Sequence, residues 1–326
     1  MSNKIKRILI LLVCGAILIS AFHFSKWGFM PSGTYRNVRS DNKLDTALEA
    51  HVKKLSDEIP KKSKSGYDRI NITAEYIKSE FKKAGYTPEI QEYKINSMEY
   101  QNIFVTKKGL TDKLLVIGAH YDTYMNPGAD DNQSGVAVLL ETAKLSATID
   151  TTDTIVFVAF VNEEPPNFQT DDMGSFVFAK GLKEKKADVS GAIILECVGY
   201  YSEAFGSQTY PPLFGLFYPN KGNFITVVSN FNSKKLAARV EKKFRSITSL
   251  PVSKAVTFDF VPGVDFSDNW GFWKEGYPSI ILTDTAFYRN PNYHTSKDVY
   301  DELDYERMAE IVEVLTKYID PNSYRH

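Results

Sequence analysis

Seven residues that could bind metal ions or transfer protons are spread along this 326-residue chain. They are His120, Asp122, Asp131, Glu163, Glu164, Glu196 and His294. Imidazole nitrogens and carboxylate oxygens are the usual zinc ligands in catalytic sites. Two divalent ions ~3.5–4 Å apart repel each other unless anions lie between them. The carboxylates of Asp131, Glu164 and Glu196 would offset most of that charge, so the residue types indicate a site for two zinc ions.

The apolar segments beside these residues predict where the side chains lie. Three runs typical of buried strands end at or just before His120, Glu163 and Glu196, and they span Leu114–Ala119, Ile155–Val161 and Ala192–Leu195. In open α/β sheets, ligands bind outside the carboxyl ends of the strands. We therefore expect these side chains to converge at one edge of a sheet.

Local spacing suggests distinct roles for neighbouring residues. Asp122 is two positions after His120, on the same side of an extended segment. It is therefore expected to accept the imidazole N–H and fix the tautomer that faces a metal. Glu163 and Glu164 would point in opposite directions in a regular strand, but Pro165 and Pro166 predict a break there. One glutamate could then bind a metal while its neighbour handles a proton.

The segment Gly128–Asn132 predicts a tight loop before a helix that opens near Ser134, a rigid place for a bridging Asp131. Taken singly, a histidine or a Glu–Glu pair is far more often solvated than bound to metal. The shared placement of the seven residues at strand ends favours a metal site. The remaining histidines, at positions 23, 51 and 326, have no such setting and are interpreted as structural or exposed.

Alternating strand and helix patterns after residue 88 predict an α/β sheet with helices on both faces. Strands are expected over Glu89–Ile95, Asn102–Thr106, Leu114–Ala119, Ile155–Val161, Ala192–Leu195, Phe224–Ser229 and Ile280–Thr283. Helices are expected over Ala47–Leu55, Ile72–Ala84, Val136–Leu145, Ser175–Lys183, Lys234–Phe244 and Tyr305–Tyr318. The aromatic, proline-containing stretch Tyr200–Phe224 suits either a long loop near the site or a packed surface loop.

The amino-terminal residues form a targeting pattern. Lys4, Lys6 and Arg7 precede the uncharged run Ile8–Phe22. Residues 1–27 are therefore predicted to be a signal peptide or an apolar helical membrane anchor, with the uncleaved anchor favoured. Residues 28–43 would be a tether and residues 44–326 a single domain. The chain would then be exported, with its catalytic domain outside the cytoplasm, or secreted if the leader is cleaved.

Composition narrows the range of partners. The net charge is −1, without a block of like charge, which argues against nucleic acid and favours a peptide or a small amino-acid conjugate. The two cysteines, Cys14 in the leader and Cys197 beside Glu196, are unsuited to a structural disulfide. The sequence gives no indication of oligomeric state.

The order of motifs resembles the co-catalytic zinc exopeptidases of metallopeptidase family twenty-eight, which includes bacterial aminopeptidases and glutamate carboxypeptidases. The resemblance spans roughly Tyr67 to Ile319. It rests on these segments: Gly118–Thr123, Gly128–Gly135, Asn162–Glu164 with Gly174–Ser175, Ser267–Asp268 and Tyr293–Thr295.

This resemblance implies a mixed, mostly parallel twisted sheet with helices on both faces, and aminopeptidase activity. One zinc ion would be bound by His120, Asp131 and Glu196, and the other by Asp131, Glu164 and His294. Glu163 would be the general base. The resemblance also implies a cis peptide bond between Asp131 and Asn132.

Three departures leave the substrate preference open. Family members often have aspartate at the position of Glu196. The segment Pro165–Met173 replaces a short glycine-containing link, and Ser267–Asp268–Asn269 stands where Ser-Asp-His is common. Glutaminyl cyclases share the architecture with a single zinc ion, so an aminoacyl cyclotransferase is one alternative function. A catalytically inactive ectodomain that binds a partner is another.

Overall fold

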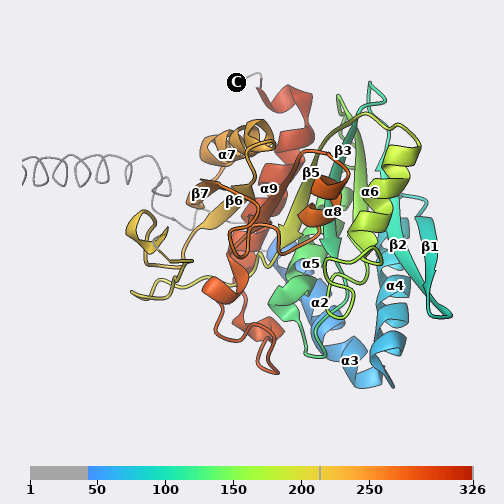
Figure 1. Cartoon of the computed structure of the whole chain (residues 1–326), viewed down its shortest axis with the longest axis horizontal. Coiled ribbons are helices and arrows are strands. Elements are labelled where there is room, and N and C mark those ends of the chain that lie inside the picture. The colour runs from blue at the N-terminus through green and yellow to red at the C-terminus, as the bar shows by residue number, and fades with distance from the viewer. Residues whose placement is uncertain (1–42, 213, 325–326) are drawn as a thin grey trace, which may run out of the picture.

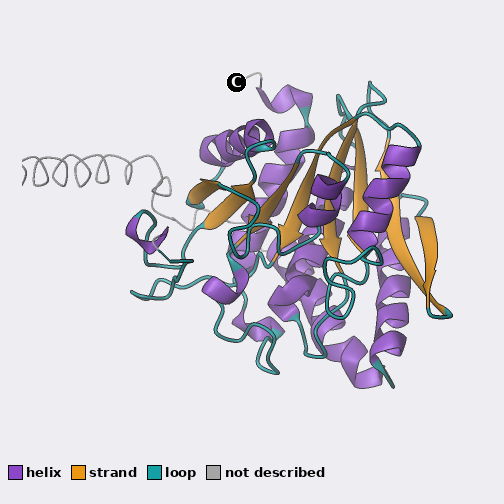
Figure 2. Cartoon of the chain, in the orientation of Figure 1, coloured by secondary structure: helices purple, strands orange, loops and turns teal. Residues whose placement is uncertain are grey.

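A computed structural model describes residues 43–212 and 214–324 of the chain. Within these residues, eight strands form one twisted sheet in the order β1-β2-β4-β3-β5-β8-β6-β7 (Figures 1 and 2). The strands are β1 Glu89–Ile95, β2 Met98–Lys107, β3 Leu114–His120, β4 Thr154–Phe160, β5 Val189–Glu196, β6 Ile225–Ser229, β7 Val252–Val256 and β8 Ser279–Thr283.

The sheet is mixed, as the family resemblance implied. Its centre, β4-β3-β5-β8, is parallel, and β6 is parallel to β7. The β1-β2, β2-β4 and β6-β8 pairs are antiparallel. The parallel centre brings the carboxyl ends of four strands to one edge, where ligands bind in such sheets.

Helices cover both faces of this sheet. They are α2 Lys43–Lys53, α3 Ile59–Lys62, α4 Gly66–Lys83, α5 Gly135–Ser146, α6 Gly174–Glu184, α7 Lys234–Ile247, α8 Asn269–Lys274 and α9 Tyr305–Ile319. One core contains side chains from α2, α4, α5, α7 and α9 together with alternate strand residues such as Ile117 and Phe157. The opposite core contains the intervening strand residues, such as Val116 and Val158, together with side chains of α6 and α8. These two helices lie in front of the sheet in Figure 1.

Sequence patterns missed β7, α8 and the four-residue helix α3. In the part of the chain that the structure describes, the strand β7 pairs only with β6, and it mixes Ser253 and Lys254 with apolar residues. It therefore lacks the apolar run of a central strand. The helix α8 has six residues, too few for a helical period to stand out. The helix predicted from Ile72 begins earlier, at Gly66, where the Ser65 side chain caps the Asp68 N–H.

The predicted leader, residues 1–27, and nearly all of the predicted tether lie outside the described residues. The helix α2 begins at Lys43, one residue before the predicted domain boundary. Within residues 43–212 and 214–324, no helix has the length and apolar content needed to cross a membrane.

Candidate metal centre

The predicted site residues converge at the carboxyl edge of the parallel strands. His120 is the last residue of β3, and Glu196 is the last residue of β5. Glu163 and Glu164 follow β4, and His294 lies in the loop after β8. Since β4, β3, β5 and β8 are consecutive neighbours in the sheet, residues far apart in sequence come within a few ångströms of one another.

The first group of side chains surrounds His120. Its Nε2 atom lies 3.4 Å from Oδ1 of Asp131 and 3.2 Å from Oε2 of Glu196. Oε2 of Glu163 lies 3.7 Å from the same nitrogen. His120, Glu163 and Glu196 offer ligand atoms within 4.8 Å of one another. The residue expected to act as the base thus lies beside the residues expected to bind the first ion.

The second group surrounds His294. Its Nε2 atom lies 2.9 Å from Oδ2 of Asp131 and 3.3 Å from Oε1 of Glu164. Asp131 therefore directs one carboxylate oxygen toward each group, which is the arrangement expected of a bridging ligand. The His294 ring is stacked between Tyr124 and Tyr293, with centroid distances of 4.5 and 3.9 Å. These contacts fix its orientation.

Polar atoms of both groups are buried without hydrogen bonds. Among the described residues, the buried polar atoms without a hydrogen-bond partner include His120 Nε2, Asp131 Oδ2, Glu164 Oε1 and His294 Nε2. A buried polar atom without a partner costs about 1–3 kcal/mol, so such atoms normally have one. A cation in each group would satisfy all four. Imidazole and carboxylate donors fit zinc, so the residues present fit the ion that the sequence implied.

The structure corrects the expected role of Asp122. The His120 Nδ1 atom lies 3.1 Å from the backbone carbonyl of Asp122 and 3.8 Å from its carboxylate. The carbonyl therefore takes the place of the carboxylate as partner of the imidazole. The carboxylate accepts the backbone N–H groups of Glu163 and Glu164, at 3.2 and 3.0 Å. Asp122 thus holds the segment that carries the glutamate pair.

The break that separates the two glutamates begins earlier than predicted. The strand β4 ends at Phe160, and Asn162 has a left-handed backbone with φ of 63°. The prolines were expected to cause the break, but they follow it. Asn162 is a residue type that tolerates positive φ better than most. The two glutamates thus lie outside the ladder and face different groups.

Asp298, whose role the sequence did not predict, fixes the loop that carries Asp131. Its two carboxylate oxygens accept the N–H groups of Asp130 and Asp131, at 2.8 and 3.2 Å. Gly128 begins the loop with φ of 66°, a conformation that favours glycine. The peptide bond between Asp131 and Asn132 is cis, as the family resemblance implied.

Glu196 is positioned by two further donors. The Ser267 hydroxyl donates to Oε2 at 2.7 Å, and the Cys197 thiol donates to Oε1 at 3.1 Å. Cys197 is buried and unpaired by any disulfide within the described residues. Each oxygen of this longer side chain therefore has a donor, which restrains a carboxylate that could otherwise rotate.

Burial and mutual repulsion shift the pKa values of the cluster. Burial raises the pKa of Glu163 well above its usual range, and burial followed by the charge of Asp131 raises the pKa of Glu164 to about 7. Burial opposes ionisation of Asp131 too, but the imidazoles outweigh it and lower its pKa to about 2. Burial would lower the pKa of His294, but Asp131 and Glu164 raise it to about 10. A bound divalent cation would favour the carboxylates and displace protons from the imidazoles.

Comparison with known proteins agrees with this geometry. The model of peptidase family M28 matches residues 102–319, more than half of the chain. The chain belongs to peptidase family M28. The prediction from the motifs that the protein is an enzyme is thereby confirmed. The family implies peptide substrates.

Two curated relatives show how far the sequence likeness extends. The chain is 40% identical over 276 residues to the uncharacterized protein YfbL of Escherichia coli K12, covering 82% of this chain and 84% of that protein. It is 26% identical over 266 residues to a probable leucine aminopeptidase of Arthroderma otae. That alignment covers 76% of this chain and 64% of the fungal protein, slightly less than two thirds.

Solved structures share the fold of this M28 peptidase. The zinc aminopeptidase BSAP of Bacillus subtilis superposes with a TM-score of 0.67 at 16% identity, covering 87% of this chain and 97% of that one. A glutaminyl cyclase of Porphyromonas gingivalis gives 0.64 at 18% identity, covering 86% and 99%. The solved structures with this fold thus include an aminopeptidase and a glutaminyl cyclase, the two classes of enzyme that the sequence suggested.

Sequence reasoning missed several supporting residues of the M28 site. Asp298 follows His294 by four positions, a spacing that could have indicated a shared role. Ser267 was noticed only through the family resemblance, without a partner. Nothing in the sequence indicated that Cys197 would donate to Glu196 or that Tyr124 would stack on His294.

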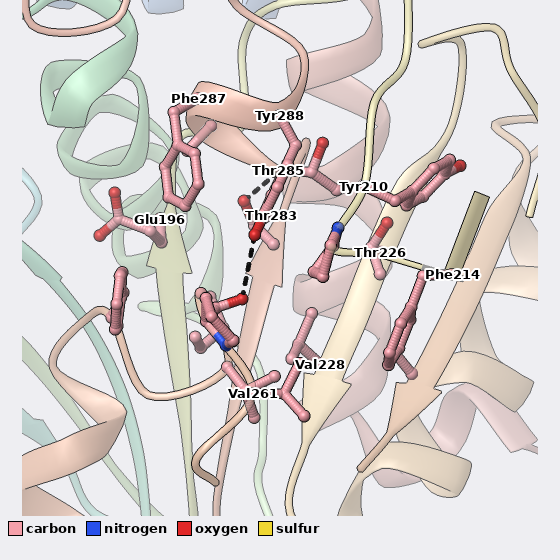
Figure 3. Close-up of a pocket in the computed structure, with 18 of the residues that line it drawn as sticks. Glu196, Tyr210, Phe214, Thr226, Val228, Val261, Thr283, Thr285, Phe287 and Tyr288 are labelled. Carbon is pink, nitrogen blue, oxygen red and sulfur yellow. Dashed lines mark hydrogen bonds between the residues drawn. The ribbon is translucent and has the colours of Figure 1, made fainter. Parts of the chain in front are cut away.

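An apolar pocket lies beside the cluster in this M28 peptidase, and Glu196 lines one end of it (Figure 3). The stretch Tyr200–Phe224 contributes Tyr210 and Phe214 to its wall. This stretch, for which the sequence suited either a loop near the site or a packed surface loop, thus forms part of the wall of a pocket that Glu196 also lines.

Replacing Asp298 by asparagine should weaken zinc binding without removing a ligand, because one acceptor oxygen becomes an amide that cannot receive an N–H. Supporting residues of this kind typically change metal affinity by about 10–100-fold. Competition with a chromogenic chelator measures the effect. Asp301→Asn, at an exposed position nearby, is the control and should bind zinc normally. Equal affinities of the two variants would contradict the positioning role.

Zinc binding should release protons at pH 7. Burial opposes protonation of His120, but Glu163 and Glu196 raise its pKa well above the usual range, so this imidazole and that of His294 should carry protons in the metal-free protein. With a pKa of about 7, Glu164 should be about half protonated. Ligands must lose these protons, so zinc affinity should increase as pH rises through the neutral range. Calorimetry in buffers of different ionisation enthalpy should give a release of roughly two protons or more per chain. A release near zero would contradict this protonation pattern.

Proposed function

We propose that this M28 peptidase removes amino-terminal residues from peptides with two bound zinc ions. His120, Asp131 and Glu196 would hold one ion, and Asp131, Glu164 and His294 the other. The observation that supports this arrangement is the orientation of Asp131, whose two oxygens face different imidazoles at 3.4 and 2.9 Å.

Attack at the amino end is favoured by the relatives. The fungal relative is named a probable leucine aminopeptidase, and the Bacillus subtilis protein with this fold is a zinc aminopeptidase. Both names describe those proteins, and the fold alone does not fix the reaction. The shared family and the site residues together make a terminal peptide bond the best-supported substrate.

Glu163 is the proposed general base. Zinc in this site would supply Lewis acidity toward the scissile carbonyl and would lower the pKa of a water molecule to about 7. Glu163, buried beside His120, would accept the proton of the attacking water and later deliver it to the leaving amine. Such proton transfer contributes about 10²–10⁴-fold to the rate.

The Asp122 carboxylate would assist by position rather than by proton transfer. Its hydrogen bonds to the N–H groups of Glu163 and Glu164 hold both glutamates at the site. One glutamate then faces His120 while the other faces His294. This explains how two adjacent residues could serve as base and ligand.

Export remains part of the proposal. The cationic residues and apolar run at the amino terminus would place the catalytic domain outside the cytoplasm, tethered to the membrane or released after cleavage. Peptides outside the cytoplasm would then be the natural substrates.

Replacing Glu163 by glutamine should lower kcat for an aminoacyl p-nitroanilide by at least about 10²-fold, because the amide cannot accept the proton. Zinc content should stay at the wild-type level, as measured by atomic absorption. Glu184→Gln, an exposed position on α6, is the matched control and should keep full activity. Undiminished turnover by the Glu163 variant would exclude this role.

Metal content separates the proposed function from its alternatives. Purified protein should contain two zinc ions per chain, lose activity with a chelator and regain it when zinc is added back. One ion per chain, together with cyclisation of an amino-terminal glutamine, would instead support a cyclase-like enzyme such as the structural relative of Porphyromonas gingivalis. Absence of zinc binding would support an inactive binding domain.

A further inference from the structure

The end of β5 places a sulfur atom beside the metal centre. In a regular strand, the side chains of Glu196 and Cys197 would point to opposite faces of the sheet. The strand ends at Glu196, and Cys197 has a left-handed backbone with φ of 47°, a conformation that residues with a Cβ atom rarely adopt. The two side chains lie together, with Sγ of Cys197 3.1 Å from Oε1 of Glu196. Both side chains therefore reach the same site.

Cys197 belongs to a group of three residues that could hold a metal ion. The other members are Asp131 and Glu196, and one ligand atom of each residue lies within 4.8 Å of the others. All three residues are less than 8% exposed. Oδ2 of Asp131 is buried without a hydrogen-bond partner, which indicates independently that this carboxylate faces a cation. The group thus offers one sulfur atom and two carboxylates as donors.

This sulfur-containing group overlaps with the group around His120. His120, Glu163 and Glu196 also offer ligand atoms within 4.8 Å of one another, so Glu196 is common to both groups. Its two oxygens face different neighbours. Oε2 lies 3.2 Å from Nε2 of His120, while Oε1 lies beside the thiol. An ion on the sulfur side would therefore compete with the first zinc ion for the carboxylates of Asp131 and Glu196.

The surroundings of the thiol differ from those of an ordinary core cysteine. A buried cysteine usually acts as a small apolar side chain. The nearby residues Leu195 and Val198 pack into the apolar core, whereas the Cys197 thiol contacts a carboxylate. A hydroxyl, such as that of Ser267 on the other oxygen, is a better hydrogen-bond donor than a thiol. Metal binding, in which thiolate is an effective ligand, gives the sulfur a role that a hydroxyl would not fill.

The sulfur atom changes which ions this group should prefer. Carboxylate ligands suit hard ions such as manganese, whereas thiolate ligands select softer ions. Zinc is borderline in this respect and binds both kinds of ligand. Cadmium is softer than zinc. Cd²⁺ should therefore bind on the sulfur side, and Mn²⁺ should be held by the carboxylates without the thiol.

We propose that Cys197, Asp131 and Glu196 form a binding site for a soft divalent metal ion beside the first zinc position. When the ion binds, the S–H bond breaks, the proton passes to solvent and a metal–sulfur bond forms, without any change of oxidation state. This inference rests on the proposed metal centre, because Asp131 and Glu196 belong to both sites. It does not depend on the peptidase reaction.

Ultraviolet spectroscopy tests for the metal–sulfur bond. The chain has two cysteines, Cys197 and Cys14 in the predicted leader, so each thiol variant is the matched control for the other. Titration of the metal-free full chain with Cd²⁺ should produce a sulfur-to-metal charge-transfer band. The Cys14→Ser protein should keep this band, and the Cys197→Ser protein should lose it. A band of unchanged size in Cys197→Ser, or no band in Cys14→Ser, would overturn the inference.

Metal selectivity distinguishes a ligand from a merely structural residue. Cys197→Ser should lower the affinity for Cd²⁺ about tenfold or more, because even residues that only support a metal ligand change the affinity by about 10–100-fold. The affinity for Mn²⁺ should change by less than about twofold, because oxygen ligands hold that ion. Competition with a chromogenic chelator measures both affinities. Equal loss of the two would indicate a structural role and overturn the inference. If Cys197→Ser does not fold, Cys197→Ala carries the same criterion.

X-ray absorption tests the bond without any substitution among the described residues. At the cadmium edge, the Cys14→Ser protein loaded with Cd²⁺ should show a bonded sulfur neighbour. A shell of nitrogen and oxygen alone would overturn the inference.

Zinc content and anilide turnover of the same protein, measured before cadmium is added, test the proposed function separately. Two zinc ions and full turnover without a cadmium–sulfur bond would overturn the inference and leave the aminopeptidase function intact. A cadmium–sulfur bond in a protein without turnover would support the inference, and only the proposed reaction would fail.

Discussion

The site depends on one electrostatic constraint, the burial of several carboxylates side by side. Asp131, Glu163, Glu164 and Glu196 are all less than 8% exposed. Within residues 43–212 and 214–324, the ion-pair contacts of these four carboxylates are made with His120 and His294, and no lysine or arginine contacts them. Buried carboxylates lose hydration and repel one another, so they ionise only with compensating charge. Burial and the charge of Asp131 make ionisation of Glu164 unfavourable, which is why its pKa is raised. Divalent cations would supply the compensating charge that lets these buried carboxylates ionise. The burial imposed by the fold therefore favours the proposed metal chemistry.

The sheet meets this constraint by the way its strands end. Parallel pairing brings β4, β3 and β5 to a common edge, and residues beyond the ladder are free to turn inward. Backbone N–H groups and acidic residues behind the site then fix the turns. Asp122 holds the glutamate pair, and Asp298 holds the loop that carries Asp131. Hydrogen bonds from residues that are not proposed ligands therefore position the ligands. These hydrogen bonds form without a metal ion.

The strands and the side chains at their ends could be predicted from the sequence, because they depend on local pattern and residue type. Apolar runs located β3, β4 and β5 to within a few residues, and the strand ends identified the side chains that converge. The sequence could not predict which atoms of these residues form hydrogen bonds with one another, because those contacts depend on backbone geometry. His120 contacts the carbonyl rather than the carboxylate of Asp122, a choice set by the turn after β3. Edge elements such as β7 were missed because tertiary pairing, rather than an apolar run, makes them strands.

Glu196 belongs both to the proposed metal centre and to the apolar pocket beside it. Its carboxylate lies beside His120, while the same residue lines one end of the apolar pocket. Glutamate has one methylene more than the aspartate common in the family, so its carboxylate needs restraint from Ser267 and Cys197. Ser267 lies next to Phe266, which lines the pocket wall. A group in the pocket would therefore lie against the same loop that orients this proposed zinc ligand. The pocket and the first metal group thus share a single short segment of the chain.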